Sequence, residues 1–285
     1  MTKLTKEEIF AMMEAHANSV PEIPPGPIPK REYPLDKTSM SYWFPLIEVA
    51  GLPVPKTRFV EMTDTCRRMI WDLFDGKGGC NNTPEPFFEN LKLAAAEMGY
   101  PCFLRTDHTS DKHSWKQTCY LDKPESVPSH VASIAEFSEC ADMMGIPWDV
   151  WAVRELLPTI PHGTCPRYGD FPVCREFRFF VDEGKVRCRH PYWPLGALKD
   201  GGWKGDYEAL CAVPGEDALR TLAERAGAAV GGSWSVDILE TERGWFVTDM
   251  AEAHKSFHWE GCPTVSGQFQ SAHLTSCGGP WGASW

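Results

Sequence analysis

The most constraining feature of the sequence is a pair of short alternating apolar and polar stretches, WSVDILE and GWFVTDM, between residues 234 and 250. Such alternation predicts two half-buried strands, and the turn that ends in Gly244 predicts a β-hairpin with a bulged three-residue loop. If residues 242–244 form this loop, Asp237 and Asp249 lie opposite each other on one face. A four-residue loop would place them on opposite faces instead.

Two carboxylates that face each other across a hairpin repel and destabilise it unless positive charge lies between them. The simplest source of that charge is a divalent cation, because Mg²⁺ binds one or two carboxylates together with phosphate oxygens. The hairpin therefore predicts a magnesium site at Asp237 and Asp249.

Composition excludes several classes of function. The net charge of −11 over 285 residues argues against binding a nucleic-acid backbone as the main task. The eleven Cys include no CxxC pair, so we expect reduced thiols in a cytoplasmic protein. A structural zinc site built from Cys and His far apart in the sequence stays open. No apolar run approaches the roughly 20 residues that cross a membrane.

A cationic loop joins two predicted strands in the first half of the chain. The strands cover residues 102–106 and 118–121, and the loop between them carries Lys112 and Lys116. A mobile loop with several cations can close over phosphates. The alternative is an ordinary solvated hairpin.

A second hairpin is predicted around a turn at residues 183–184. With a two-residue loop, Arg178 faces Arg189, and Glu176 and Arg187 lie on the same face. Several Arg on one face repel unless an acid, a phosphate or water separates them, which suits polyphosphate binding. An exposed face with Glu176 as local partner is the alternative.

This order of strands, cationic loop, Arg-bearing hairpin and acidic hairpin resembles the ATP-grasp superfamily over residues 59–258. The chain looks most like the divergent phage and bacterial arginine-to-lysine clade. It is also similar to the eukaryotic cell-division-cycle proteins that act as translation-factor assembly chaperones. The resemblance implies an α+β fold in which two α/β subdomains grip ATP between antiparallel sheets, preceded by a smaller N-terminal α/β region.

The resemblance also implies phosphate-binding residues. Within PCFLRTD, Arg105 takes the place of the Lys that contacts the α- and β-phosphates in most of the superfamily. Lys112 and Lys116 would reach the γ-phosphate from the lid, and Arg178 of REFRFFV would contact a phosphate or acyl phosphate. Arg189 is a weaker candidate. Of these residues, the resemblance favours Arg178 and Lys116 as catalytic.

The remaining implied residues belong to the hinge and the metal site. VRELLP would be the hinge, where Glu155, Leu156 and Leu157 meet adenine and ribose, and Asp237 and Asp249 would hold Mg²⁺. The last strand departs from the usual acid–x–Asn pattern. Ala251 stands where Asn is expected, and Glu252 or His254 would have to replace it. His254 and His258 are open to a role at the acceptor substrate or in packing.

The implied activity is an ATP- and Mg²⁺-dependent ligase, in which a carboxylate becomes an acyl phosphate and then joins an amine or similar nucleophile. Its substrates would be small molecules, peptides or proteins, with no nucleic acid and no membrane. The alternative is a non-catalytic ATP-binding assembly factor for a protein partner. The expected organisation is a helix and Pro-rich arm (1–36), a pre-grasp α/β region (37–99), an ATP-grasp domain (100–260) and a Gly- and Trp-rich tail (261–285).

Overall fold

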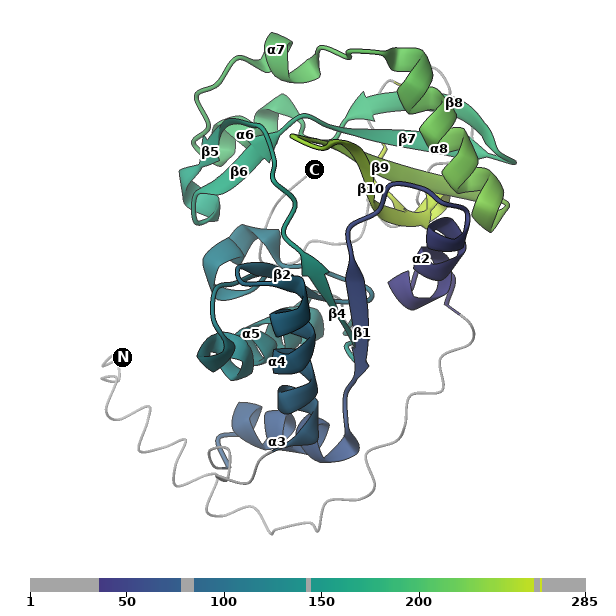
Figure 1. Ribbon diagram of the computed structural model, residues 1–285. Helices are drawn as coiled ribbons and strands as arrows, with labels where there is room; N and C mark the ends of the chain where they lie inside the picture. The colour runs from purple at the N-terminus through teal and green to yellow at the C-terminus, as the bar shows by residue number, and fades with distance from the viewer. Residues whose placement is uncertain (1–35, 78–84, 142–144, 259–261, 263–285) are drawn as a thin grey trace, which may run out of the picture. The chain divides into compact units, whose positions relative to one another are not determined.

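The computed structural model describes residues 36–77, 85–141, 145–258 and 262 (Figure 1). Contacts divide the chain into residues 1–33 and 34–285, and every described residue lies in the second unit. The expected N-terminal arm, apart from Asp36, and the expected tail, apart from Cys262, lie outside the described residues.

One four-stranded antiparallel sheet, sheet A, has the order β1-β4-β2-β3. Its strands β1 and β4 pair with each other although they are far apart in the sequence, since Thr57 lies opposite Arg154. Helices α3, α4 and α5 lie beside this sheet (Figure 1). The elements are β1 (Thr57–Glu61), α3 (Asp64–Phe74), α4 (Pro86–Met98), β2 (Cys102–Thr106), β3 (Tyr120–Leu121), α5 (Val127–Cys140) and β4 (Val150–Glu155).

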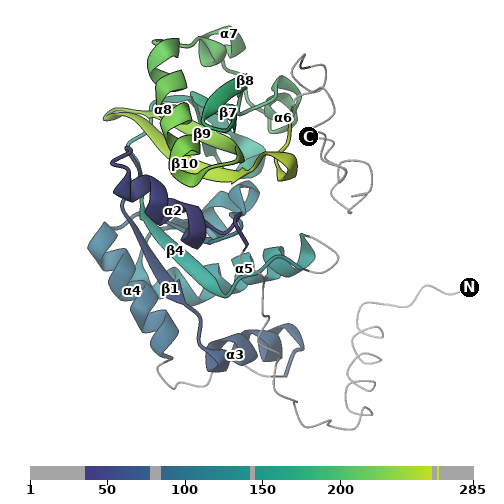
Figure 2. The ribbon, with the colours of Figure 1, turned by 90° about the vertical axis from the view of Figure 1, so that its right-hand side faces the viewer.

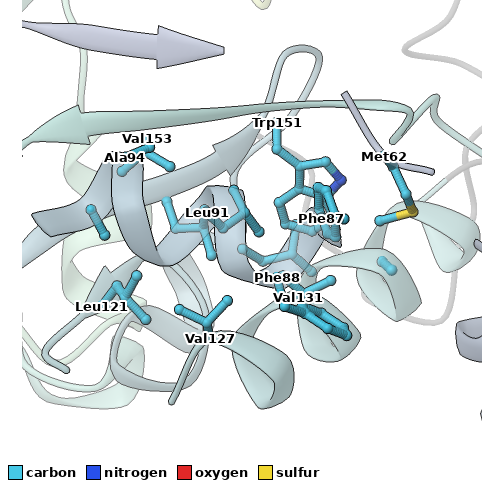
Figure 3. Packing of buried hydrophobic residues seen from close by; sticks show 14 of the residues in the cluster. Met62, Phe87, Phe88, Leu91, Ala94, Leu121, Val127, Val131, Trp151 and Val153 are labelled. Carbon is cyan, nitrogen blue, oxygen red and sulfur yellow. The ribbon is translucent and has the colours of Figure 1, made fainter. Parts of the chain in front are cut away.

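Helix α4 shows how the sequence builds the core of this part. The side chain of Glu85 accepts a hydrogen bond from the backbone N–H of Phe87 at 2.7 Å, and Pro86 occupies the first turn. The helix ends at Gly99, whose φ of +82° few other residues adopt. Its apolar spacing buries Phe87 and Leu91 among residues of α5 and sheet A (Figure 3).

A second four-stranded antiparallel sheet, sheet B, has the order β10-β9-β7-β8. Helices α2 and α8 pack with one of its faces in a single apolar cluster (Figure 2). Helix α8 approaches closely at Gly227, where a Cβ would lie 2.5 Å from Val181 Cγ1. The elements are α2 (Met40–Val49), β7 (Glu176–Asp182), β8 (Lys185–Pro191), α8 (Glu216–Val230), β9 (Ser233–Thr241) and β10 (Gly244–Glu252).

The two sheets share this second cluster, because Ala152 of β4 and Phe59 of β1 pack into it together with residues of sheet B. The opposite surface of β4, with Trp151 and Val153, belongs to the cluster of α4 and α5. Strand alternation therefore sends Ala152 and Arg154 toward sheet B and leaves the helices on the other side.

A smaller part completes the described residues. Strands β5 (Pro161–Cys165) and β6 (Phe171–Cys174) pair with each other, and α6 (Leu195–Asp200) and α7 (Tyr207–Cys211) pack with them around Trp193 and Trp203. Short 3-10 segments include η1 (Lys112–Gln117), η2 (Pro124–Ser126), η3 (Pro166–Tyr168) and η4 (Ala253–Lys255). Within the described ranges, no helix has the length and apolar character needed to span a membrane.

Candidate functional site

Both large sheets contribute charged side chains to one site. Sheet A supplies two guanidinium groups, sheet B supplies three carboxyl groups and a guanidinium, and η1 supplies an ammonium group. The members are Arg105 (β2), Lys112 (η1), Arg154 (β4), Glu176 and Arg178 (β7), Asp237 (β9) and Asp249 (β10).

Arg178 and Asp237 form a two-pronged ion pair across neighbouring strands of sheet B. Arg178 Nε donates to Asp237 Oδ1 at 2.7 Å, and Nη2 donates to Oδ2 at 2.8 Å. The two residues are direct partners in the β7–β9 register, so their side chains share a face. Burial disfavours the charged guanidinium, but Asp237 outweighs this and raises the pKa of Arg178. The planar pair fixes the guanidinium in place.

Arg105 and Asp249 link the two sheets. Arg105 Nη1 donates to Asp249 Oδ2 at 2.9 Å, and its Nε donates to the carbonyl of Thr106 at 2.9 Å. Burial alone would raise the pKa of Asp249, but the charges of Arg105 and Lys112 hold it below its usual value. Asp249 therefore stays ionised at neutral pH.

Lys112 lies in the site, from a segment that the sequence predicted to be a lid. Its Nζ lies 3.3 Å from the hydroxyl of Tyr192 and 4.8 Å from the centre of that ring. Burial would lower the pKa of Lys112, but Tyr192 and the carboxylates of Glu176, Asp249 and Asp237 raise it. The guanidinium of Arg178 lies 5.0 Å from the centre of the same ring. Tyr192 thus holds two cations through its π face.

Glu176 is a buried carboxyl group with a shifted pKa. Burial and the negative charge of Asp237 outweigh the attraction of Lys112 and raise its pKa to about 7. Its Oε1 accepts a hydrogen bond from the hydroxyl of Thr248 at 3.2 Å. Near neutral pH this group can therefore hold or release a proton beside the cations.

Among the cations of this site, Arg154 is the one whose charge its described neighbours stabilise least. Its Nε donates to Thr57 Oγ1 at 3.3 Å and its Nη1 donates to the carbonyl of Thr248 at 2.8 Å. Its Nη2 is buried and has no hydrogen-bond partner among the described residues. Burial, followed by the charge of Arg105, lowers the pKa of Arg154 to about 9. A buried guanidinium beside a second Arg, with one nitrogen unpartnered, favours the approach of an anion.

In the acidic hairpin, Asp237 and Asp249 face each other as predicted, but the loop and the strand register differ from those expected. Its loop contains two residues, since Thr241 pairs with Gly244, and this differs from the expected three. A bulge at Thr248 then shifts the register by one residue, and Asp249 lies opposite Asp237. The facing of the two acids is confirmed, while the expected loop length is wrong.

The Arg-bearing hairpin departs from its predicted register. The turn is at Glu183–Gly184, with positive φ at both residues, as a two-residue turn requires. A bulge at Arg187 then places Arg178 opposite His190, so the expected pairing with Arg189 is wrong.

As a result, Arg187 and Arg189 do not join Arg178. Arg187 Nη2 lies 2.9 Å from Asp182 Oδ2. Arg189 lies on the face of α8, 5.1 Å from the centre of the Phe177 ring.

The other residues expected at the site have different surroundings, and the expected adenine-binding role of the hinge stays a prediction. Lys116 pairs with Asp170 at 3.0 Å, and both side chains are more than half exposed. Glu155 ends β4 and accepts hydrogen bonds at 2.9 Å from the backbone N–H of Lys56 and the side chain of Arg243. In the connection that follows, Leu156 is half-buried and Leu157 is buried.

Sequence reasoning missed Arg154, Tyr192 and Thr248, and treated Glu176 only as a partner for Arg. One signal pointed to Arg154, because it is a charged residue that follows four apolar residues within the strand VWAVRE, two positions from Ala152. The bulge at Thr248 and the position of Tyr192 after β8 have no comparable signal in the sequence.

The donor set fits a hard divalent cation. Asp237 and Asp249 face each other, and each carboxylate oxygen has more than one acceptor position. Both oxygens of Asp237 accept from Arg178, whereas Asp249 Oδ1 accepts from the backbone N–H of Met250 at 3.1 Å. Ala251 offers no side-chain ligand, and the carboxylate of Glu252 pairs with Lys255 at 3.1 Å.

Known structures resemble this chain in fold. C-terminally truncated Cdc123 from Schizosaccharomyces pombe matches with 14% identity and a TM-score of 0.50, covering 84% of this chain and 90% of that one. The predicted α+β fold class is confirmed. No protein-family model matches the sequence, and no curated protein matches it.

Similar structures also include ATP-grasp proteins. The RimK domain ATP-grasp protein from Sphaerobacter thermophilus DSM 20745 has 16% identity and a TM-score of 0.42. The match covers 75% of this chain and 58% of the length of the RimK domain protein. D-alanine–D-alanine ligase from Bacillus anthracis, complexed with ATP, has 9% identity and a TM-score of 0.42, covering 75% of this chain and 52% of that one. At these identities the likeness concerns the fold alone.

Proposed function

We propose that this chain binds ATP with Mg²⁺ and acts as a ligase that activates a carboxylate as an acyl phosphate and joins it to an amine or similar nucleophile. The observation that carries the proposal is Arg154, whose buried Nη2 has no partner among the described residues and which lies beside Arg105. A polyphosphate would supply the missing acceptor and the missing negative charge.

The other cations have complementary roles in this proposal. Arg105 and Arg154 come from sheet A and would bind the phosphates that stay with the leaving nucleotide. Lys112 and Arg178, held at the ring of Tyr192, would neutralise the charge on the transferring phosphoryl group. The carboxylate substrate would attack the γ-phosphorus and release ADP, and the nucleophile would then displace phosphate from the acyl carbon.

Asp237 and Asp249 are the residues that would hold Mg²⁺. The ion, when bound, supplies charge neutralisation on the phosphate oxygens. The ion pairs with Arg178 and Arg105 orient both carboxylates beforehand. Since Ala251 replaces the expected Asn, we propose one ion held by these two acids.

The second candidate is an ATP-binding assembly factor that does not turn over ATP. It is favoured by the similarity to Cdc123, which extends over most of both chains, and by Ala251. It needs the same nucleotide site, so ATP binding alone does not separate the two candidates, whereas turnover does.

The test begins with calorimetric titration of Mg²⁺·ATP into the full chain and two variants. Arg154→Gln removes the unpartnered guanidinium, and Arg58→Gln removes an exposed Arg of β1 that pairs with Glu97 of α4. We expect at least a tenfold loss of affinity for Arg154→Gln and less than a twofold change for Arg58→Gln. Equal affinity in both variants, or no binding by the parent chain, contradicts the nucleotide site.

Turnover is then measured as ADP release in the presence of mixtures of carboxylates and amines. Substrate-dependent release that Asp249→Asn abolishes supports the ligase. Tight ATP binding without release in any mixture, together with a stable complex with a protein partner, supports the assembly factor.

A further inference from the structure

Four metal-binding side chains meet at the edge of sheet B, outside the nucleotide site. Cys188 and His190 belong to β8, and His258 and Cys262 belong to the chain that follows η4. One ligand atom from each of these residues lies within 4.8 Å of all the others. One residue separates Cys188 from His190, and three residues separate His258 from Cys262.

The strand explains the first pair. Cys188 and His190 are two residues apart, so their side chains leave β8 on the same face. In the register, Cys188 lies opposite Phe180 and His190 lies opposite Arg178. The cluster therefore occupies the same face of sheet B as Arg178, at the edge strand.

The second pair arrives by a path across the sheet. The segment follows β10, which is the edge strand of sheet B opposite β8. Ser256 Oγ lies 2.5 Å from Ser235 Oγ on β9, and the ring of His258 lies 4.3 Å from that of Phe180 on β7. His258 Nε2 then lies 3.0 Å from Cys188 Sγ on β8. The segment thus crosses β9, β7 and β8 in turn.

We propose that Cys188, His190, His258 and Cys262 form a structural zinc site. Two thiolates and two imidazoles are the ligand set that tetrahedral Zn²⁺ takes in structural sites. With Zn–S near 2.3 Å and Zn–N near 2.0 Å, neighbouring ligand atoms in a tetrahedron lie about 3.3–3.8 Å apart. The four ligand atoms lie at most 4.8 Å apart, so the longest separations would contract by about 1 Å, and the 3.0 Å between His258 Nε2 and Cys188 Sγ would lengthen by about 0.5 Å.

The composition of the site indicates its role. Four protein ligands fill the coordination shell and leave no position for a substrate, so the ion holds structure in place. It fastens the segment after η4 to the edge strand, across the face that carries Arg178. The proposal is independent of nucleotide binding, because neither the four ligands nor the readouts below involve ATP.

The first measurement is the metal content of the full chain, purified without chelator or affinity-tag metal, by mass spectrometry. We expect about one Zn²⁺ per chain. Cys188→Ser and Cys262→Ser should each lower this to below about 0.2, while Cys140→Ser, at an exposed Cys outside the cluster, should leave it unchanged. Circular dichroism identifies any variant that fails to fold.

The second measurement uses the parent chain, so it does not depend on variants folding. Zinc is removed with a chelator and replaced by Co²⁺, which in a tetrahedral site with two thiolates absorbs in the visible range and shows thiolate-to-metal charge transfer. One equivalent should saturate both bands, and Zn²⁺ should abolish them. A chain without zinc that gives no thiolate–cobalt band overturns the proposal, as does a disulfide between Cys188 and Cys262 in the freshly purified protein.

Discussion

Asp237 lies directly opposite Asp249 across the β9–β10 hairpin, although the bulge at Thr248 interrupts the register between them and the loop. Each acid pairs with an Arg from a different sheet, Asp237 with Arg178 and Asp249 with Arg105. The repulsion expected between facing carboxylates is thereby offset by protein cations. This arrangement orients both acids and holds the pKa of Asp249 below its usual value.

The pair of Arg178 and Asp237 should be strongly coupled. We expect Arg178→Ala to lower the free energy of unfolding by about 3 kcal/mol, because it leaves a buried carboxylate without its partner. Adding Asp237→Asn should recover most of this loss, since the unpaired charge disappears. Urea unfolding of the parent, the two single variants and the double variant measures the coupling energy. Additive effects within about 0.5 kcal/mol would show that the ion pair is not the source of the loss.

Lys112 and Lys116 form a matched pair on the same 3-10 segment. Lys112→Met should weaken Mg²⁺·ATP binding about tenfold or more, because a charge-assisted contact contributes about 1.5–3 kcal/mol. Lys116→Met should change it less than twofold, because Lys116 pairs with Asp170 in an exposed position. Calorimetric titration measures both. The reverse order of effects would support the lid position predicted from sequence and contradict the site described above.

The buried charge of Arg154 should destabilise the protein when no nucleotide is bound. We expect Arg154→Met to keep or raise the melting temperature, because it removes a buried charge whose pKa has fallen to about 9. The same change should abolish the rise in melting temperature that Mg²⁺·ATP gives the parent chain. Thermal unfolding with and without nucleotide tests both statements. A melting temperature many degrees lower, with the nucleotide effect intact, would assign Arg154 a purely structural role.

Glu176 should make stability depend on pH near neutrality. Its pKa rises from 4.5 to about 7 on folding, so its favourable contribution is fully present below about pH 4.5 and is lost as the pH rises through 7. Glu176→Gln removes this dependence. The free energy of unfolding of the parent minus that of the variant should therefore fall between pH 5 and pH 8, by on the order of 2–3 kcal/mol.

Urea unfolding at several pH values measures this difference, and groups common to both proteins cancel. A difference that stays constant over this range would show that Glu176 ionises normally in the folded protein.

Local sequence pattern was sufficient for much of the framework. The strand at Cys102–Thr106 was predicted to the residue, because a short apolar run and the polar loop that follows it define it. The facing of Asp237 and Asp249 was also predicted, but two deviations cancelled, since a shorter loop and a bulge shift the register in opposite senses.

What the sequence could not show depends on contacts between distant segments. The bulge at Arg187 turned Arg189 to the other face, and bulges are set by packing that no local pattern records. Lys112 and Lys116 are equivalent in the sequence, and only their contacts in the fold, with Tyr192 and with Asp170 respectively, distinguish them. Likewise, the unpartnered nitrogen of Arg154 becomes visible only when all its neighbours are known.

The pairing of β1 with β4 has a consequence for how the protein is made. Thr57 of β1 pairs with Arg154 of β4, almost 100 residues later in the chain, and β4 lies between β1 and β2 in sheet A. During translation, β1, α3, α4 and β2 leave the ribosome before the strand that joins them exists. Although β2 can already pair with β3, sheet A can be completed only after residue 155 has emerged, and until then β1 and the other edge of β2 are unpaired.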